Sequence, residues 1–400
     1  MALEIPKSSN DITKQWLQEA LKSSEKAENV EVIEISQLKE KTGFLSGAVK
    51  AKVNINGNEK NLFIKTIIGQ DDPFRTFYDT SNLDELEIRF YKEYLPALVD
   101  FTKQESSENE NTKLHGLENM IVKFYCGDYS LDKEERGFYL ILNDLSSQYK
   151  VKTGPEGLNF GQTKDIFVKI AKFHATAYAF NAKNPAKVNN WNLRSWREKA
   201  SKHTDFILLM ESCFDKLVKS YETAKNPDLV KSVGNLQNYW IDLYSGGEID
   251  RKFVTHGDLW INNIMVKKNS DEAIILDWQT LCPDHPVFDV AFLLCTSLTI
   301  ENLENWTDDL IKFYVESFQE ACVDFKMELP FDLEKFKKMF FDQNILLFMS
   351  WKSMGDENTR CKNITECISK YFELIQSPIE VKLSKVLKLY SSGMLKNQTN

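Results

Sequence analysis

Residues 255–266 read Thr-His-Gly-Asp-Leu-Trp-Ile-Asn-Asn-Ile-Met-Val, and residues 274–279 read Ile-Ile-Leu-Asp-Trp-Gln. The first stretch has the spacing H-x-D-x-x-x-x-N, in which kinases place a catalytic Asp and a metal-binding Asn. In this chain these residues are Asp258 and Asn263, and Asp277 follows at the end of an apolar run. Phosphoryl transfer needs a base for the acceptor hydroxyl and oxygen ligands for Mg²⁺. The pattern therefore predicts that Asp258 is the catalytic base and that Asn263 and Asp277 bind the metal.

The residues between these carboxylates predict a β-hairpin. Two short apolar runs, at 264–266 and 273–276, flank a polar turn at 268–271, which is typical of two strands joined by a turn. Such a hairpin would bring Asn263 and Asp277 to the same end. The alternative is a polar loop in which these residues only cap turns.

Length and composition agree with a soluble enzyme of two lobes, because 400 residues exceed the usual size of one hydrophobic core. The net charge of −9 argues against nucleic acid as a routine partner. The seven cysteines are scattered without a C-x-x-C pair, which argues against a zinc site or a disulfide framework. Neither a signal-peptide pattern nor a run of about 18 apolar residues occurs, so we expect a cytoplasmic protein with no membrane partner.

An apolar run at residues 61–68 is interrupted by Lys65. A buried ammonium group needs a partner, and kinases pair a phosphate-binding lysine in such a strand with a glutamate on a helix. On the helix expected at residues 82–95, Glu87 lies on the apolar stripe, four positions from Leu83 and from Tyr91. We therefore predict an ion pair between Lys65 and Glu87. The alternative for Lys65 is an edge strand from which it reaches water.

Turn residues divide the N-terminal third into strands. Asn56-Gly57 predicts a β-hairpin turn. The glycine-containing turn at residues 42–47 could cover nucleotide phosphates, or it could be an ordinary hairpin turn. Further strands are expected at residues 120–126 and 137–142, with a polar acidic loop at 103–113 before them.

The segment Asn143-Asp144-Leu145 follows the last of these strands and predicts the connector between the lobes. Backbone groups of Asn143 and Leu145 would offer one donor and one acceptor to the edge of adenine. This places an N-terminal nucleotide-binding lobe at residues 1–143 and a C-terminal catalytic and substrate-binding lobe at 144–400.

The remainder of the chain has the periodicity of amphipathic helices. In the helix expected at residues 163–179, His174 lies on the apolar stripe, and we interpret it as a core histidine, not a catalytic one. Aromatic residues are frequent after residue 280, and candidates for an apolar acceptor pocket are Phe292, Phe341, Phe348 and Trp351.

Taken together, these motifs resemble the ecdysteroid kinase-like family, which is similar to choline kinases and aminoglycoside phosphotransferases. The resemblance covers residues from about 30 to 300. It depends on the segment from His256 to Met265, on Ile275-Leu-Asp-Trp-Gln, on the segment Pro286 to Leu294 with Asp289, and on Leu62-Phe-Ile-Lys65. The doublet Asn262-Asn263 is its most distinctive element.

The resemblance implies an α+β, bilobal, protein-kinase-like fold, with a small antiparallel-sheet N-lobe that has one main helix and a larger, mainly helical C-lobe. It implies ATP and Mg²⁺ as cofactors and a small-molecule alcohol, ecdysteroid-like or xenobiotic, as acceptor. Lys65 with Glu87 would bind the phosphates, and Asp289 would brace the catalytic loop. The chain departs from the family in having Asn143 where Glu is usual and Trp278 where Phe is commoner.

Two classes of function remain. One is an ATP-dependent small-molecule O-kinase, and the other is a catalytically silent kinase-like protein that binds a nucleotide or ligand. The intact set of Asp258, Asn263 and Asp277 favours the kinase. A protein kinase is disfavoured because Trp278-Gln279 replaces Phe-Gly and no Ala-Pro-Glu triplet follows, so we predict no protein partner. Because residues 280–390 have few carboxylate clusters beside aromatics, we expect a bulky apolar alcohol instead of a cationic amine.

Overall fold

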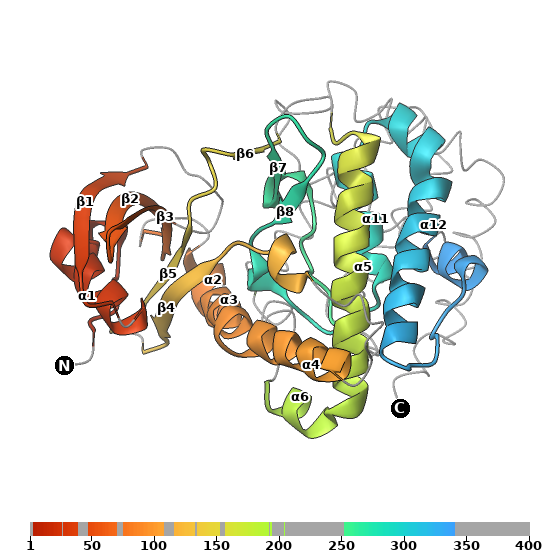
Figure 1. Ribbon diagram of the computed structural model, residues 1–400, viewed down its shortest axis with the longest axis horizontal. Helices are drawn as coiled ribbons and strands as arrows, with labels where there is room; N and C mark the ends of the chain where they lie inside the picture. The colour runs from red at the N-terminus through yellow and green to blue at the C-terminus, as the bar shows by residue number, and fades with distance from the viewer. Residues whose placement is uncertain are drawn as a thin grey trace.

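The computed structural model describes residues 3–191, with gaps at 26, 39–46, 70–74, 108–115, 133 and 153–156, then residues 193 and 204, and residues 252–340. A five-stranded antiparallel sheet forms the N-terminal part (Figure 1). Its strands lie in the order β1-β2-β3-β5-β4. Their bounds are β1 Val30–Gln37, β2 Gly47–Ile55, β3 Asn58–Thr66, β4 Phe124–Ser130 and β5 Gly137–Asn143.

The predicted hairpin turn at Asn56-Gly57 joins β2 to β3. Both residues have positive φ, 51° and 85°, which a two-residue turn of the type preferred in hairpins requires. The register that follows pairs Lys65 with Ala48 on one side and with Leu140 of β5 on the other. The turn therefore fixes which face of the sheet carries Lys65.

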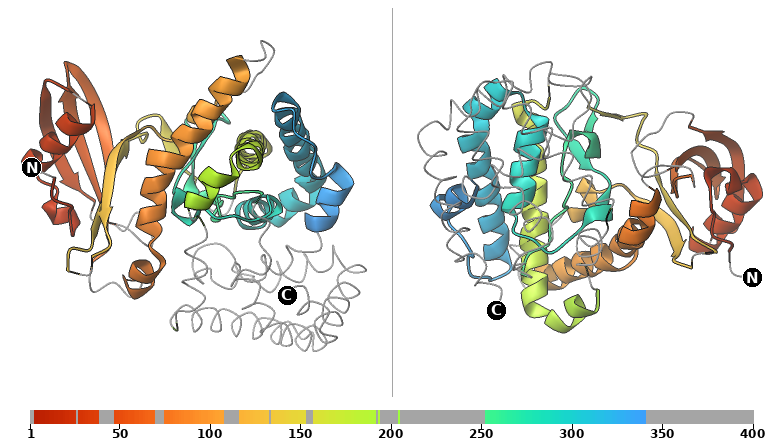
Figure 2. Two further views of the ribbon diagram at one scale, coloured as in Figure 1. Left: turned by 90° about the horizontal axis from the view of Figure 1, so that it is seen from below. Right: turned by 180° about the vertical axis from the view of Figure 1, so that it is seen from behind.

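The opposite face of the sheet packs against α1 (Lys14–Glu25). Leu17 and Leu21 of this helix are fully buried in a cluster with Val49, Val53 and Ile64. Alternation along a strand sends neighbouring side chains to opposite faces, so burial of Ile64 under α1 directs Lys65 to the other side. That side faces the rest of the molecule (Figure 2).

The helix that carries Glu87 is longer than predicted. After α2 (Arg75–Ser81), α3 (Leu83–Arg89) continues through a π-helical turn at Phe90–Tyr94 into α4 (Leu95–Ser107). The expected end at residue 95 was wrong, as was the expected loop over residues 103–107. The N–H of Leu95 bonds to the carbonyl of Phe90, and this wider turn lets the helix pass Pro96, which would clash in a regular α-helix.

The predicted hairpin after the catalytic-loop motif is confirmed. Strand β7 (Ile264–Lys267) pairs with β8 (Ala273–Ile275), and Ile264 lies opposite Ile275. A third strand that was not predicted, β6 (Tyr149–Val151), pairs with β7. Short 3₁₀ turns occur at Ser9–Asp11, Leu117–Met120, Ile261–Asn263 and Trp278–Thr280.

The C-terminal part is mainly helical. It contains α5 (Phe160–Lys183), α6 (Pro185–Trp191), α11 (Val287–Ser297) and α12 (Ile300–Asp324), and α12 lies alongside α5 (Figures 1 and 2). Asn159 and Gln162 form a reciprocal capping box at the start of α5. In the described ranges no helix is both long and apolar enough to span a membrane.

This arrangement confirms the predicted α+β architecture, a small antiparallel sheet with one long helix followed by a helical region. Strand β5 ends at Asn143, the residue after which the lobe boundary was predicted. The assignment of residues 1–143 and 144–400 to two lobes stays a prediction.

Candidate active site

The lysine that the sequence singled out lies in a buried cluster of charges. Its Nζ donates to Oε2 of Glu87 and to Oδ1 of Asp277, both at 2.6 Å, and to Oε1 of Gln279 at 3.1 Å. The predicted ion pair between Lys65 and Glu87 is thus present, with side chains only 9% and 2% exposed. Since an ammonium group has three donors, every N–H of Lys65 already has a protein partner.

The electrostatics of this cluster follow from one cation facing two carboxylates. Burial disfavours the ammonium of Lys65, but the charges of Asp277 and Glu87 outweigh it and raise its pKa. Burial raises the pKa of Glu87 to about 7, although Lys65 acts to lower it. The cluster therefore keeps Lys65 protonated, whereas Glu87 takes up a proton more readily than an exposed glutamate does.

The predicted base and the first predicted metal ligand lie in direct contact. Nδ2 of Asn263 donates to both the backbone oxygen and Oδ2 of Asp258, each at 2.9 Å. Burial and the nearby charge of Asp277 raise the pKa of Asp258 well above its usual range, while the bond from Asn263 acts to lower it. A carboxylate in this environment is a stronger proton acceptor than one in water.

Backbone hydrogen bonds join this pair to the lysine cluster. The N–H of Leu276, the residue before Asp277, donates to the carbonyl of Asn263 at 2.8 Å. His256 adds a second link, because its Nδ1 accepts the N–H of Asp258 at 3.2 Å and its Nε2 lies 2.8 Å from the carbonyl of Leu276. This pattern requires the neutral ring with its proton on Nε2, and burial lowers the pKa of His256 accordingly.

Asp289 also holds the loop of residues 256–258, called here the catalytic loop, which carries the predicted base. Its Oδ2 accepts the N–H of His256 at 2.6 Å, and its Oδ1 accepts the N–H of Gly257 at 3.0 Å. Gly257 has φ +83°, and a Cβ there would lie 2.3 Å from the carbonyl oxygen of Thr280. Only glycine fits this position, so the peptide that precedes Asp258 is tightly constrained.

An aromatic stack connects the helix of Glu87 to the turn of Asp277. Trp278 is fully buried and lies parallel to Phe90, with ring centroids 4.4 Å apart. It also contacts Phe173 and His256 edge-on or tilted. The Trp that replaces the commoner Phe is therefore accommodated in the core.

Two lysines hold the segment after β5, the predicted connector, one from β2 and one from the β7–β8 turn. Lys50 of β2 donates to Oδ2 of Asp144 and to Oγ of Ser146, both at 2.9 Å. Lys268, from the β7–β8 turn, donates to the carbonyls of Ser146 and Ser147. Asn143 donates its N–H to the carbonyl of Lys123 at 2.9 Å. For Leu145, the carbonyl accepts the N–H groups of residues 148 and 149.

Sequence reasoning missed two residues of this site. Gln279 bonds Lys65 and also donates to Oδ2 of Asp277 at 3.3 Å; its position two residues after Asp277 was the available signal. His256 was treated only as part of a motif, although its ring bonds the backbone of both Asp258 and Leu276.

Phe292 is the one predicted pocket candidate that lies among the described residues, and it is buried and stacked on Phe288.

Several predicted features lie outside the described residues. These are the turn at residues 42–46 and three of the pocket candidates, Phe341, Phe348 and Trp351.

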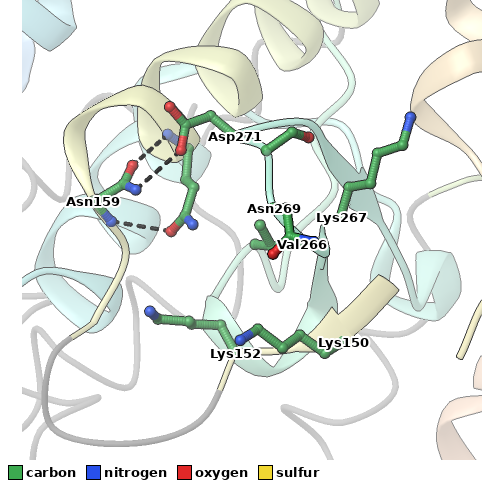
Figure 3. Close-up of a pocket in the computed structure, with 9 residues that line it drawn as sticks. Lys150, Lys152, Asn159, Val266, Lys267, Asn269 and Asp271 are labelled. Carbon is green, nitrogen blue, oxygen red and sulfur yellow. Dashed lines mark hydrogen bonds between the residues drawn. The ribbon is translucent and has the colours of Figure 1, made fainter. Parts of the chain in front are cut away.

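A cavity of about 370 Å³ lies elsewhere, at the turn end of the β7–β8 hairpin (Figure 3). Lys150, Lys152 and Asp271 line it, and Asp271 also accepts a hydrogen bond from Asn159 at 3.0 Å. A Cβ on Gly161 would lie 2.0 Å from Oδ2 of Asp271. The carboxylate of Asp271 thus already packs against the positively polarised start of α5, and this cavity is distinct from the cluster around Lys65.

The donor atoms at the candidate active site suit Mg²⁺, which prefers oxygen ligands. The side chain of Asp277 is 27% exposed, and the amide of Asn263 uses its Nδ2 on Asp258, which leaves Oδ1 to bind a cation. Among the described residues no group of three or more His, Cys, Asp or Glu side chains is placed to hold a metal. Asp277 and Asn263 are the residues that would hold such a cation, and their role as metal ligands stays a prediction.

Comparison with known proteins decides the family. The sequence matches the ecdysteroid kinase-like family over residues 41–327, which is well over half of the chain. The chain belongs to the ecdysteroid kinase-like family. Membership confirms the resemblance seen in the motifs and supports small-molecule kinase activity. It implies use of ATP and a divalent metal in general terms.

Similar solved structures include two small-molecule kinases. Choline kinase from Cryptosporidium parvum Iowa II is 12% identical, with 91% of each chain covered and a TM-score of 0.37. Ethanolamine kinase from Plasmodium vivax is 11% identical, with 87% of this chain and 84% of that chain covered and a TM-score of 0.38. A search of curated proteins gave no match. Because both TM-scores are low, the functional conclusion for this ecdysteroid kinase-like protein depends on the family and on its own residues.

Proposed function

We propose that this protein transfers the γ-phosphoryl group of ATP to a hydroxyl of a small, largely apolar molecule, such as an ecdysteroid-like or xenobiotic alcohol. One observation supports this most strongly. The hydrogen-bonded pair of Asp258 and Asn263 is joined through Leu276 to the cluster of Lys65, Glu87 and Asp277. A base, a phosphate-binding cation and oxygen ligands for a metal are the groups that phosphoryl transfer needs.

Each residue has a role that its contacts support. Asp258 would take the proton of the acceptor hydroxyl. Asp277 and Asn263 would hold Mg²⁺, which neutralises phosphate charge when bound. Lys65 would bind the phosphates, and because its three donors are in use, it must release one bond to do so. The bond to Gln279, at 3.1 Å, is the longest of the three.

For the other end of the nucleotide, we propose that backbone groups of Asn143 and Leu145 bind adenine. Since the N–H of Asn143 and the carbonyl of Leu145 have backbone partners, the acceptor would be the carbonyl of Asn143 and the donor the N–H of Leu145. The connector that carries them is held by Lys50 and Lys268, so its backbone groups would be presented in a fixed orientation. Replacement of the usual Glu by Asn143 would change local geometry and leave this backbone recognition intact.

The choice of acceptor rests on composition. Residues 280–390 are rich in aromatic and apolar side chains, and small-ligand pockets are mostly apolar with a few placed polar groups. An apolar alcohol suits a pocket of such composition better than a quaternary amine, which favours aromatic cages with nearby carboxylates. The absence of a protein partner and the cytoplasmic location stay predictions.

The test is a transfer assay. Purified protein with ATP and Mg²⁺ is incubated with steroid, phenolic, sugar and choline-like alcohols, and mass spectrometry detects products one phosphate heavier. We expect the best kcat/KM with a steroid or phenolic alcohol, and turnover lower by roughly 10²–10⁴-fold with Asp258→Asn at matched protein concentration. Choline as the best acceptor would contradict the apolar class, and ATP binding without transfer to any acceptor would favour the silent binding protein.

A further inference from the structure

A chain of buried polar groups extends from the catalytic loop to α12. Asp289, on α11, accepts from Nε2 of His174 at 3.1 Å, and Nδ1 of His174 lies 2.7 Å from the hydroxyl of Tyr314. His174, Asp289 and Tyr314 are each 0% exposed. The three residues come from α5, α11 and α12, helices that lie together in the C-terminal part (Figure 1).

We propose that Tyr314 is a positioning residue for the catalytic loop, acting through His174 and Asp289. The proposal rests on the proposed function, in which Asp258 is the base. Tyr314 touches neither the base nor the predicted metal ligands in the described structure, so any effect on catalysis must pass through this chain of hydrogen bonds.

The protons along the chain have one arrangement that satisfies every group. Asp289 also receives two backbone N–H groups, and as a carboxylate it can only accept. Nε2 of His174 must therefore carry a proton, and in the neutral ring Nδ1 then accepts the O–H of Tyr314. Burial raises the pKa of Tyr314 well above its usual value, so the phenol keeps the proton that it donates. Were the ring doubly protonated, the buried hydroxyl hydrogen would lose this acceptor, which is costly.

Asp289 thus fixes the proton of His174 on Nε2, and the hydroxyl of Tyr314 holds the ring in place through Nδ1. Without that hydroxyl, Nδ1 would be a buried acceptor with no donor, and the ring would shift to find another partner. A shift of the ring would move its Nε2–H against the carboxylate of Asp289, which holds the N–H groups of His256 and Gly257 at 2.6 and 3.0 Å. Since these peptides lead directly into Asp258, the base would be displaced from its position against Asn263.

The test is Tyr314→Phe, which removes the hydroxyl and keeps the ring that packs against Phe336 with centroids 5.1 Å apart. We expect kcat to fall by about tenfold, the effect of one lost buried hydrogen bond on a positioned group. The KM for ATP should stay within about twofold, because the lysine cluster is untouched. The matched control is Tyr178→Phe, which removes a hydroxyl from α5 that bonds the carbonyl of Glu328 at 3.4 Å and should leave kcat unchanged.

A second readout uses the nucleotide-free protein and needs no acceptor. Nitrogen-15 NMR should show His174 with its proton on Nε2 in the parent, and the Nδ1 resonance should move in Tyr314→Phe toward that of a nitrogen without a hydrogen-bond donor. The amide resonances of His256 and Gly257 should shift in that variant and not in Tyr178→Phe. If no alcohol is phosphorylated by the parent, the proposed function fails while these resonances still decide whether Tyr314 positions the loop. Parent-like resonances, or a tenfold loss of kcat in both variants, would overturn the proposal.

Discussion

The buried cluster at the end of β3 has one cation, Lys65, and two carboxylates, Glu87 and Asp277. With all three ionised its net charge is −1, in a site where Lys65 and Glu87 are almost fully buried. Burial raises the pKa of Glu87 to about 7, from an ordinary value of 4.5. In the absence of nucleotide and metal, ionisation of Glu87 should therefore destabilise the fold even though its partner is a lysine.

The perturbation that isolates this effect is Glu87→Gln, which keeps the shape of the side chain and removes its charge. Between pH 4.5 and 7 the folded protein binds more protons at this site than the unfolded chain, so stability falls as pH rises through that window and is level above it. For Glu87, a rise in pKa from 4.5 in the unfolded chain to about 7 in the folded protein lowers the free energy of unfolding above pH 7 by about 3 kcal/mol. Relative to the parent, Glu87→Gln should be similar in stability at pH 5 and more stable by up to about 3 kcal/mol at pH 8.

Urea denaturation in the presence of a chelator, at intervals from pH 5 to 8.5, measures the difference in the free energy of unfolding between variant and parent. The matched control is Glu85→Gln on the same helix, whose carboxylate is 22% exposed; it removes the same charge outside the buried cluster. The reasoning is refuted if the Glu87→Gln difference is constant with pH or no larger than that of Glu85→Gln, or if the Glu87→Gln variant loses stability relative to the parent as pH rises. That second result would mean that Lys65 stabilises the Glu87 charge by more than burial destabilises it.

Three further predictions concern the base, the metal and acid stability. Asp258→Asn should keep ATP binding and lower turnover by roughly 10²–10⁴-fold, and parent-like turnover would remove Asp258 from its role. Asp277→Ala should weaken Mg²⁺-dependent nucleotide binding more than Asn263→Ala, since it removes a formal charge from the cation's ligands; calorimetry that shows affinity indifferent to both variants and to chelator would contradict the two-ligand site. Burial lowers the pKa of His285 to about 3, so stability should be lost as pH falls from about 6.5 toward 3, by about 3 kcal/mol at pH 4. In His285→Gln, the free energy of unfolding should fall less steeply between pH 6.5 and 4. A dependence on pH equal to that of the parent would show that His285 does not cause this loss of stability.

The parts of the site that the sequence predicted are those formed by local contacts or by a single periodicity. Asp258 and Asn263 are five positions apart, so the loop itself brings them together. The hairpin that follows depends on a polar turn between two apolar runs. The pair of Lys65 and Glu87 needed only that each residue lie on the buried side of its own element.

The parts that could not be predicted depend on tertiary packing. Asp277 is 212 positions from Lys65, and no pattern along the chain indicates that both it and Gln279 bond the same ammonium group. The length of the helix was missed for a different reason. Pro96 favours a helix end in a local interpretation, whereas the π turn at Phe90–Tyr94 removes the clash that makes proline a helix breaker.

The π turn and the Trp278 stack together explain how distant carboxylates converge on Lys65. Phe90 is the first residue of the π turn and lies parallel to Trp278, which directly follows Asp277. Glu87 is three positions before Phe90, close to one helical turn, so the face that contacts Trp278 also carries the carboxylate. Asp277 itself has φ 64° and ψ 64°, a left-handed conformation that is costly for a non-glycine residue and that surrounding contacts must maintain. We infer that the stack supplies those contacts, so that the position of the helix and the position of Asp277 depend on each other.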